Sequence, residues 1–240
     1  LVVGFAEAGH PEMIQQALHQ AWDAKAPFSS GTAPFTGLPF NEVLIDTNHM
    51  GHRVVADIDG DGANDILSVN FIDGAHAVVW YAYPEWTRHV IVEMNTYGDY
   101  TQYRSDDLAA ADIDGDGDLD AIGRVGPADD GNGLVVWWEN PRPGGAATNR
   151  PWTRHDIGNT DYVKDLAVED FDLDGRPDVA ARETEETHVF RQASSSMWVR
   201  VLQRAHPSHE GMASGDLDAD GDPDLVLNGF WLRNPHPADL

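Results

Sequence analysis

One nine-residue motif occurs four times in this sequence and restricts what the chain can fold into. Each copy reads Asp-x-Asp-x-Asp-Gly-x-x-Asp, and the copies span 57–65, 112–120, 170–178 and 216–224. Their first residues lie 55, 58 and 46 positions apart. A repeat period near 50 residues indicates an architecture in which one supersecondary unit is used several times.

The motif has the residue types and the spacing of a calcium loop. Calcium takes roughly 6–8 oxygen ligands, and carboxylates at positions 1, 3 and 5 of a tight turn converge on its concave side. The glycine at position 6 allows the bend that turns the position-7 carbonyl inward, and the position-9 aspartate closes the shell. Without a cation, four carboxylates this close would repel one another strongly. We therefore predict about four structural Ca2+ ions, held by Asp57, Asp59, Asp61, Asp65, Asp112, Asp114, Asp116, Asp120, Asp170, Asp172, Asp174, Asp178, Asp216, Asp218, Asp220 and Asp224.

The residues around the motif argue against an EF-hand. An EF-hand needs a glutamate at position 12 and a helix on each side of the loop. Position 12 is occupied here by Ser68, Gly123, Ala181 and Leu227. The flanks, such as 53–56 and 66–69, have the β-branched and apolar residues of strands. Each loop is therefore expected to join two strands.

Each loop lies in a longer repeat of four expected strands. In the first repeat these are 54–56, 66–71, 77–81 and 86–91, the last of them beginning with a Trp-Thr-Arg-His sequence. Four antiparallel strands in about 50 residues form one blade of a β-propeller, so the predicted fold class is all-β. Large aromatic residues are expected to fill the space between blades. These include Trp80, Trp86, Trp137 and Trp152.

The repeats predict a single propeller domain, or a fragment of one, over 1–240. We expect complete blades at 47–92, 93–157 and 158–204, and the rear of a preceding blade at 1–46. Residues 205–240 are expected to be the front of a following blade, without its third and fourth strands. Apolar residues at 14, 18 and 22 after Pro11 predict one short inserted helix. Because residues 1–5 resemble residues 225–230, both partial blades are expected to contain the same strand, and we favour the interpretation that this chain is a piece of a larger propeller. The alternative is that the two partial blades combine and close a small ring.

The loops and their blade context resemble the FG-GAP/VCBS family of calcium-binding β-propellers, over about residues 40–240. That family includes integrin α-subunit heads, fungal lectins and the propellers of polysaccharide lyases. The Trp-Thr-Arg-His strands and the Val-Val-Trp-Trp-Glu-Asn run at 135–140 resemble secreted bacterial VCBS proteins in particular. The resemblance implies a secreted or cell-surface location, extracellular or periplasmic. The motif is specific for fold and metal but not for function, because one fold hosts many activities.

Charge and composition exclude several kinds of partner. There are 15 Lys and Arg residues against 41 Asp and Glu, which gives a net charge of −26. This charge would repel nucleic-acid phosphates and anionic membrane surfaces. No apolar run approaches the roughly 20 residues of a membrane span, so no membrane insertion is expected. The sequence has no cysteine, which excludes thiolate metal sites and cysteine catalysis.

A glycan or protein ligand is expected on the face opposite the calcium loops. The connections between blades on that face include 46–53, 95–107 and 158–165, where histidine, tyrosine and much of the scarce positive charge gather. Aromatic rings can stack on sugar faces, and arginines hydrogen-bond in pairs with acidic groups. The candidate ligand-binding residues are His49, Arg104, Arg124, Tyr162, Lys164 and Arg182.

Three functions remain open from the sequence, and a non-enzyme is favoured. The first is a recognition module, foremost for carbohydrate. The second is a polysaccharide lyase acting on a uronate-containing glycan, with His52, Tyr103 and His209 as candidate catalytic residues. The third is a structural or adhesin repeat of a larger surface protein, with further blades or domains of a longer chain as its partners. The i, i+3 histidine pairs His49/His52 and His206/His209 leave a second type of metal open.

Overall fold

The computed structural model describes residues 42–47, 49–72, 75–93, 107–126, 133–207, 211–227 and 229–235. The chain divides into two compact units, Leu1–Val43 and Leu44–Leu240, and all the described strands belong to the second. The strand expected at 1–5 and the helix expected at 11–22 lie outside the described residues. Within the described ranges there is no helix, and so none that is long and apolar enough to cross a membrane.

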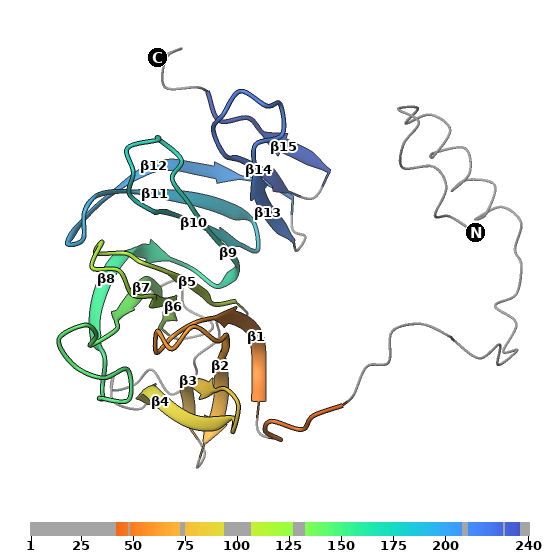
Figure 1. Cartoon of the computed structure of the whole chain (residues 1–240). Coiled ribbons are helices and arrows are strands. Elements are labelled where there is room, and N and C mark those ends of the chain that lie inside the picture. The colour runs from red at the N-terminus through yellow and green to blue at the C-terminus, as the bar shows by residue number, and fades with distance from the viewer. Residues whose placement is uncertain are drawn as a thin grey trace, which may run out of the picture. The chain divides into compact units, whose positions relative to one another are not determined.

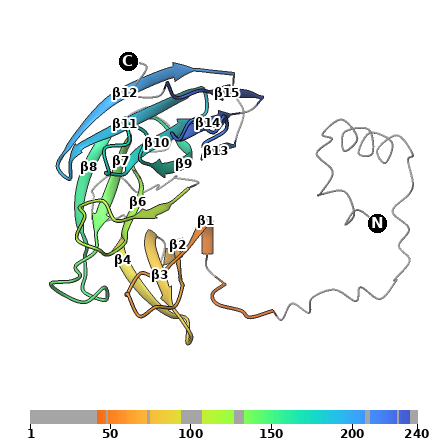
Figure 2. The ribbon, with the colours of Figure 1, turned by 45° about the horizontal axis from the view of Figure 1, so that its top comes forward.

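The described residues form four antiparallel sheets that follow one another in chain order (Figures 1 and 2). The first sheet consists of β1 (His49–Ala56), β2 (Asp65–Ile72), β3 (Ala75–Ala82) and β4 (Thr87–Glu93). The second consists of β5 (Ala109–Ala111), β6 (Asp120–Val125), β7 (Gly133–Glu139) and β8 (Thr153–Thr160). The third consists of β9 (Val163–Glu169), β10 (Asp178–Glu183), β11 (Glu186–Ser194) and β12 (Met197–Ala205). The fourth consists of β13 (Met212–Gly215), β14 (Asp224–Leu227) and β15 (Phe230–Leu232).

Every acidic loop joins the first and second strands of its sheet, as the flanking residues predicted. The residue before each loop pairs with the position-9 aspartate: Ala56 with Asp65, Ala111 with Asp120, Glu169 with Asp178, and Gly215 with Asp224. The predicted all-β class, the strand–loop–strand arrangement and the exclusion of an EF-hand are confirmed for the described residues.

The fourth sheet differs from its prediction. The apolar run 225–230 was expected to be one strand, with no third strand after it. Instead β14 ends at Leu227, and Phe230 opens β15, which returns antiparallel with Leu227 opposite Phe230. Gly229 has a φ of +82°, a backbone conformation that glycine adopts without steric cost, and it permits the turn between the two strands. Residues 205–240 therefore contain a third strand.

Two predicted connections are shorter than expected, because strand pairing continues beyond the apolar residues. Strand β1 begins at His49, so His49 and His52 lie on a strand and not in a loop over 46–53. Strands β8 and β9 leave only Asp161 and Tyr162 between them, and Lys164 belongs to β9. The expected break after residue 157 is therefore displaced to Thr160.

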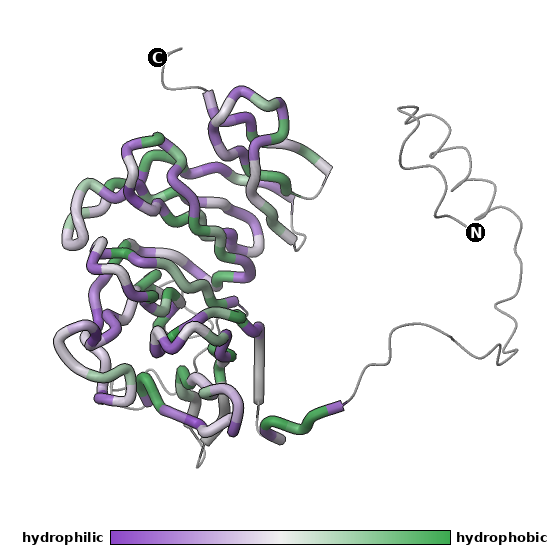
Figure 3. The backbone as a smooth tube through the Cα atoms, viewed as in Figure 1, coloured by the Kyte–Doolittle hydropathy of each residue, from purple (hydrophilic) through white to green (hydrophobic). Residues whose placement is uncertain are grey.

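Each sheet has two faces that pack against different neighbours, since side chains alternate along a strand. We call the face turned to the next sheet in the chain the forward face, and the other the rear face. Figure 3 shows apolar residues interleaved with polar ones along the strands. In three successive clusters, forward-face residues pack against rear-face residues of the next sheet. These pairs are Leu67 and Trp80 with Ala121 and Trp138, Ile122 and Trp137 with Val179 and Phe190, and Ala180 and Val189 with Leu225 and Leu232.

The aromatic residues assigned to the core lie there. Trp80, Trp137 and Trp152 are buried in the clusters between sheets. Trp86 is partly buried and packs against the rear face of the first sheet, next to Tyr81. The expectation that these rings belong to the packed core is confirmed for the three buried ones.

A polar contact repeats at all three interfaces between sheets, and we call it the amide clamp. A side-chain amide near the end of the third strand donates a hydrogen bond to a backbone carbonyl at position 2 of the preceding sheet's loop. The pairs are Asn140 Nδ2 to Ile58 O (2.9 Å), Gln192 Nε2 to Ile113 O (2.6 Å) and Asn234 Nδ2 to Phe171 O (2.7 Å). Tyr83 occupies the corresponding position of the first sheet and has no side-chain amide. The clamp therefore ties each of the first three acidic loops to the sheet that follows it.

Removing one clamp is expected to destabilise the protein. Asn140 is buried and donates to both Ile58 O and Leu119 O, so Asn140→Ala leaves buried carbonyls without a partner. Such a loss costs about 1–3 kcal/mol, measurable as a lower midpoint in urea unfolding. Asn64→Ala, which changes an exposed asparagine in the first loop, is the matched control and should stay within about 0.5 kcal/mol. Equal effects of the two substitutions would contradict a clamping role.

Candidate metal sites and a candidate ligand pocket

The four acidic loops share one pattern of internal hydrogen bonds. The position-1 aspartate accepts from backbone amides at positions 5 and 6, so that the chain wraps around its carboxylate. For Asp57 the donors are Asp61 N (3.1 Å) and Gly62 N (3.0 Å). Asp112 and Asp170 have the same pair of donors, and Asp216 accepts from Gly221 N. This wrapping gathers the side chains of the first positions on the inside of the turn.

The wrapped backbone uses left-handed conformations at two positions of every loop. The position-6 glycines have φ between +88° and +100°, as the predicted bend requires. Position 4 is also left-handed, and it holds Gly60 and Gly115 in two loops but Leu173 and Ala219 in the others. A left-handed conformation costs a residue with a Cβ atom roughly 1–2 kcal/mol, so the third and fourth loops are held in it by their surroundings.

Each loop brings three carboxylates close enough to hold one metal ion. In each group the ligand oxygens lie within 4.8 Å of one another. The groups are Asp57, Asp59 and Asp61; Asp112, Asp114 and Asp120; Asp170, Asp172 and Asp178; and Asp216, Asp218 and Asp224. All the donors are carboxylate oxygens, which hard cations prefer. Twelve of the sixteen predicted ligands are thus brought together in threes, while Asp65, Asp116, Asp174 and Asp220 lie in the same loops outside these groups.

The position-9 aspartate has a framework role that the motif did not predict. Its Oδ2 accepts from the backbone amide at position 2, and its Oδ1 accepts from a backbone amide at the end of the third strand. In the second sheet, Asp120 binds Ile113 N (3.0 Å) and Asn140 N (2.8 Å) in this way. The same two bonds occur at Asp65, Asp178 and Asp224. Each carboxylate oxygen keeps a further lone pair, so the framework role is compatible with binding a cation.

Arginine side chains already pair with carboxylates of the third and fourth loops. Arg176 pairs with Asp174, and Arg191 Nη1 lies 3.4 Å from Asp172. Arg233 pairs with Asp218 and Asp220 at 2.6 and 2.9 Å. These arginines are about half exposed, and ion pairs at that exposure contribute little. A divalent ion at these loops can therefore compete with the guanidinium groups.

Burial makes the charged form of several loop carboxylates costly. Desolvation raises the pKa of Asp120 to about 8 and that of Asp178 to about 6. Asp118, at position 7 of the second loop, is 6% exposed, and neither carboxylate oxygen has a hydrogen-bond partner in the described residues. Desolvation, followed by repulsion from Asp116, raises its pKa to about 7. A cation placed among these groups would favour their ionised form.

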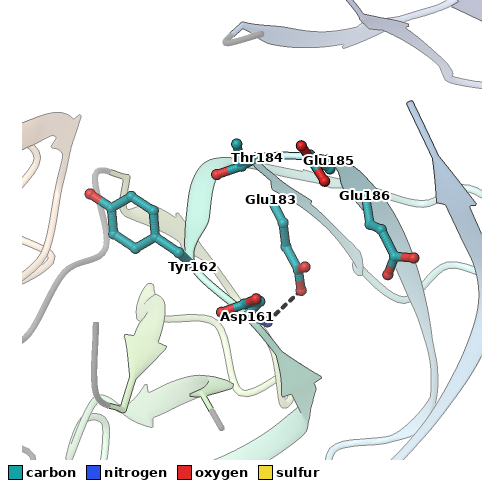
Figure 4. A pocket seen from close by; sticks show the side chains of 6 residues that line it. All are labelled: Asp161, Tyr162, Glu183, Thr184, Glu185 and Glu186. Atoms are coloured by element: carbon teal, nitrogen blue, oxygen red, sulfur yellow. Dashed lines mark hydrogen bonds between the residues drawn. The ribbon is translucent and has the colours of Figure 1, made fainter. Parts of the chain in front are cut away.

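A separate pocket lies at the opposite ends of the strands of the third sheet (Figure 4). The acidic loop connects β9 to β10 at one end, whereas the pocket is built from the β8–β9 and β10–β11 connections at the other. Its volume is about 320 Å3. It is lined by Asp161, Tyr162, Glu183, Thr184, Glu185 and Glu186. Four of these six side chains are carboxylates, so the pocket is strongly negative.

The candidate ligand-binding residues fall into three groups. Tyr162 lines the pocket, and Lys164 Nζ lies 4.4 Å from the centre of its ring. Arg124 and Arg182 are fully buried and bind other parts of the chain. Arg124 Nε donates to the backbone carbonyl of Asp161 (2.6 Å), and Arg182 Nη1 donates to the carboxylate of Asp165 (3.0 Å). Their side chains present no surface to a ligand in this structure. Arg104 and the side chain of His49 lie outside the described residues.

The one described catalytic candidate takes part in a contact between sheets. His52 Nδ1 lies 3.0 Å from Asp107 Oδ1, and Asp107 Oδ2 accepts from Leu166 N in the third sheet. Burial raises the pKa of Asp107. These bonds link β1, the segment before β5, and β9. Tyr103 and His209 lie outside the described residues, so no catalytic group is assembled from the three candidates in the described part of the chain.

Sequence reasoning missed a cluster of Glu183, Glu186 and His188 beside the pocket. His206 had been considered for a second metal, but its Nε2 lies 3.0 Å from Thr187 Oγ1, and it belongs to none of the described clusters. The available signal was the Glu-x-x-Glu-x-His spacing across the tight β10–β11 turn, because a hairpin brings the ends of such a segment together.

No protein-family model matches this sequence, and no curated protein matches it significantly. Any functional assignment therefore depends on the chemistry of the loops and of the pocket. The resemblance to the FG-GAP/VCBS family stays a prediction.

The pKa shifts predict that the metal-free protein loses stability as pH rises. In the unfolded chain, aspartates titrate near 3.8, whereas Asp120, Asp118 and Asp178 titrate at about 8, 7 and 6 in the folded protein. Between these values the folded state holds protons that the unfolded state has released, so raising the pH favours unfolding. Thermal melts after removal of metal on a chelating resin should give a higher Tm at pH 5 than at pH 8.

Asp118→Asn is the matched variant for this prediction, because it removes a titrating group whose oxygens have no hydrogen bond in the described structure. This substitution should raise the Tm of the metal-free protein at pH 8 and make its Tm depend less on pH. A metal-free Tm that increases from pH 5 to pH 8 would contradict the assignment.

Proposed function

We propose that this chain is a calcium-stabilised β-propeller module of the FG-GAP/VCBS type that recognises carbohydrate outside the cytoplasm. The observation that carries the proposal is that the two ends of the strands have different chemistry. Acidic loops with clustered carboxylates lie at one end of the sheets, and a polar pocket with an aromatic ring lies at the other end of the third sheet. The first end suits structural ions, and the second suits a ligand rich in hydroxyl groups.

Calcium is the cation that the loops fit best. Their donors are oxygens alone, and calcium accepts a large and flexible oxygen shell. Four ions would change the net charge from −26 by +8 to −18 and offset the repulsion within each loop.

The propeller arrangement is supported by repetition of one interface. The same forward-to-rear packing and the same amide clamp join sheets one to two, two to three and three to four. On the forward face of the fourth sheet, Leu217, Val226 and Trp231 are 48%, 37% and 42% exposed, although the corresponding Ile58, Leu67 and Trp80 of the first sheet are buried. We propose that a further blade covers this face.

The lining of the pocket narrows the ligand class. Four carboxylates would repel a uronate, but they are good acceptors for sugar hydroxyl groups. The Tyr162 ring offers a face for a sugar ring, and Lys164 beside it can donate a hydrogen bond. A neutral glycan therefore fits better than the uronate polymer that a lyase would require. A protein ligand, and a purely structural or adhesin role, remain outcomes of the binding test.

Two substitutions in the second loop test the calcium proposal. Asp114→Ala should lower Tm in millimolar Ca2+ but change it little in chelator, because Asp114 belongs to the metal cluster and is exposed. Asp120→Ala should lower Tm in both, since it leaves the amides of Ile113 and Asn140 without an acceptor, at about 1–3 kcal/mol for each. Wild-type protein should melt at a markedly higher temperature in Ca2+ than in chelator. Equal wild-type melts in the two buffers would refute the calcium proposal.

A glycan array in Ca2+, with a parallel ultraviolet assay on uronate polymers, tests the recognition role. We expect binding to neutral glycans without growth of absorbance. Tyr162→Ala should weaken that binding about tenfold or more, whereas Tyr83→Ala, at an exposed tyrosine on the first sheet, should leave it unchanged. Growth of absorbance would establish the lyase alternative. If neither glycan binding nor growth of absorbance is observed, a structural or protein-binding role would be favoured.

A further inference from the structure

Three side chains of the third sheet converge from the two sides of the β10–β11 turn. His188 Nε2 lies 3.0 Å from Glu183 Oε1 and 3.6 Å from Glu186 Oε2. The side chains of His188 and Glu183 are 3% and 9% exposed, whereas that of Glu186 is 38% exposed. Glu183 and Glu186 also line the 320 Å3 pocket (Figure 4). Two of the donors are therefore nearly buried, and both glutamates border the pocket, with Glu186 the more exposed of the two.

The two separations from His188 Nε2 match those of a tetrahedral metal site, and all three ligand atoms lie within 4.8 Å of one another. Zinc binds histidine nitrogen at about 2.0–2.1 Å and carboxylate oxygen at about 2.0–2.2 Å, which places two tetrahedral ligands about 3.3–3.5 Å apart. The observed 3.0 and 3.6 Å bracket this value. The three ligand atoms can thus reach one ion with only small movements.

The surroundings of the cluster hold two of the donors in place. Asp161 N donates to Glu183 Oε1 at 2.5 Å, across the connection between β8 and β9. Such a hydrogen bond to a ligating carboxylate fixes its orientation toward a metal. On the other side of the imidazole, His188 Nδ1 is buried and has no hydrogen-bond partner in the described part of the chain. This Nδ1 faces away from the two glutamates, so Nε2 is the nitrogen that would bind a metal.

The donor set differs from that of the four acidic loops. The loops offer oxygens alone, whereas this cluster adds an imidazole, which suits zinc and similar transition metals. It also lies at the opposite ends of the strands from the third loop, because β10 runs from Asp178 in that loop to Glu183 in the cluster. A cation here would be independent of the loop ions.

We propose that Glu183, Glu186 and His188 form a further metal site, for a borderline divalent cation such as Zn2+, with an open coordination position toward the pocket. Three protein ligands and an open fourth position leave room for water or for an oxygen of a bound ligand. The proposal stands on the geometry of the cluster and does not require that the pocket bind sugar. The competing interpretation is a hydrogen bond between His188 and Glu183 with no metal.

A cobalt titration of the whole chain in millimolar Ca2+ distinguishes a metal site from a hydrogen bond between His188 and Glu183 without a metal. Calcium occupies the acidic loops, so cobalt binding that persists reports the new site, and Co2+ gives visible absorption bands when it is four-coordinate. We expect one equivalent of Co2+ that is displaced by Zn2+. Glu186→Gln should weaken binding at least tenfold and should fold normally, because this side chain is partly exposed.

Matched controls exclude binding elsewhere. Glu185→Gln removes a carboxylate of the same pocket that is not in the cluster, and it should leave cobalt affinity nearly unchanged. Asp114→Ala, in the second acidic loop, should also leave it unchanged. The proposal is overturned if no calcium-resistant cobalt binding is found, or if Glu186→Gln binds as tightly as wild type. No sugar is present in this titration, so its failure would not affect the glycan proposal.

Discussion

The position-9 aspartate of each acidic loop makes the contact on which the rest of the structure depends. One oxygen of its carboxylate binds the amide at the second loop position, and the other binds the amide at the end of the third strand. The residue that supplies the second amide also supplies the side chain of the clamp to the preceding sheet in three of the four sheets. In these three sheets a single buried carboxylate therefore connects the loop, the end of the third strand and the residue that contacts the preceding sheet.

This arrangement has an electrostatic cost that a bound cation would offset. Asp120 is almost fully buried, and its neighbours Asp112 and Asp114 add negative charge within one short turn. Desolvation raises the pKa of Asp120 to about 8, so its ionised form is disfavoured in the protein alone. A cation in the cluster reverses that preference, because it replaces the lost hydration of the carboxylates. Folding and metal binding are thus expected to be coupled at the loops.

The opposite ends of the strands follow a different chemistry. There the buried Arg124 binds the connection between β8 and β9, the buried Arg182 pairs with Asp165 on the neighbouring strand, and carboxylates line the pocket of the third sheet. The inferred metal site lies at these strand ends and resembles the acidic loops in using carboxylates, but it adds the imidazole of His188. An ion there would make the pocket less repellent to hydroxyl-rich ligands by offsetting part of its negative charge.

The sequence by itself determined the all-β class, the strand–loop–strand units and the carboxylate clusters of the loops. These features depend on residues close together in the chain, such as Asp112 and Asp114, whose spacing alone brings their side chains to one side of a turn. Only the tertiary structure decided which residues serve the framework and which face a ligand. Arg124 was expected on the surface but is buried, because the next sheet supplies the carbonyl of Asp161 to its guanidinium. The amide clamps likewise join residues of neighbouring sheets, and no local pattern specifies such pairings.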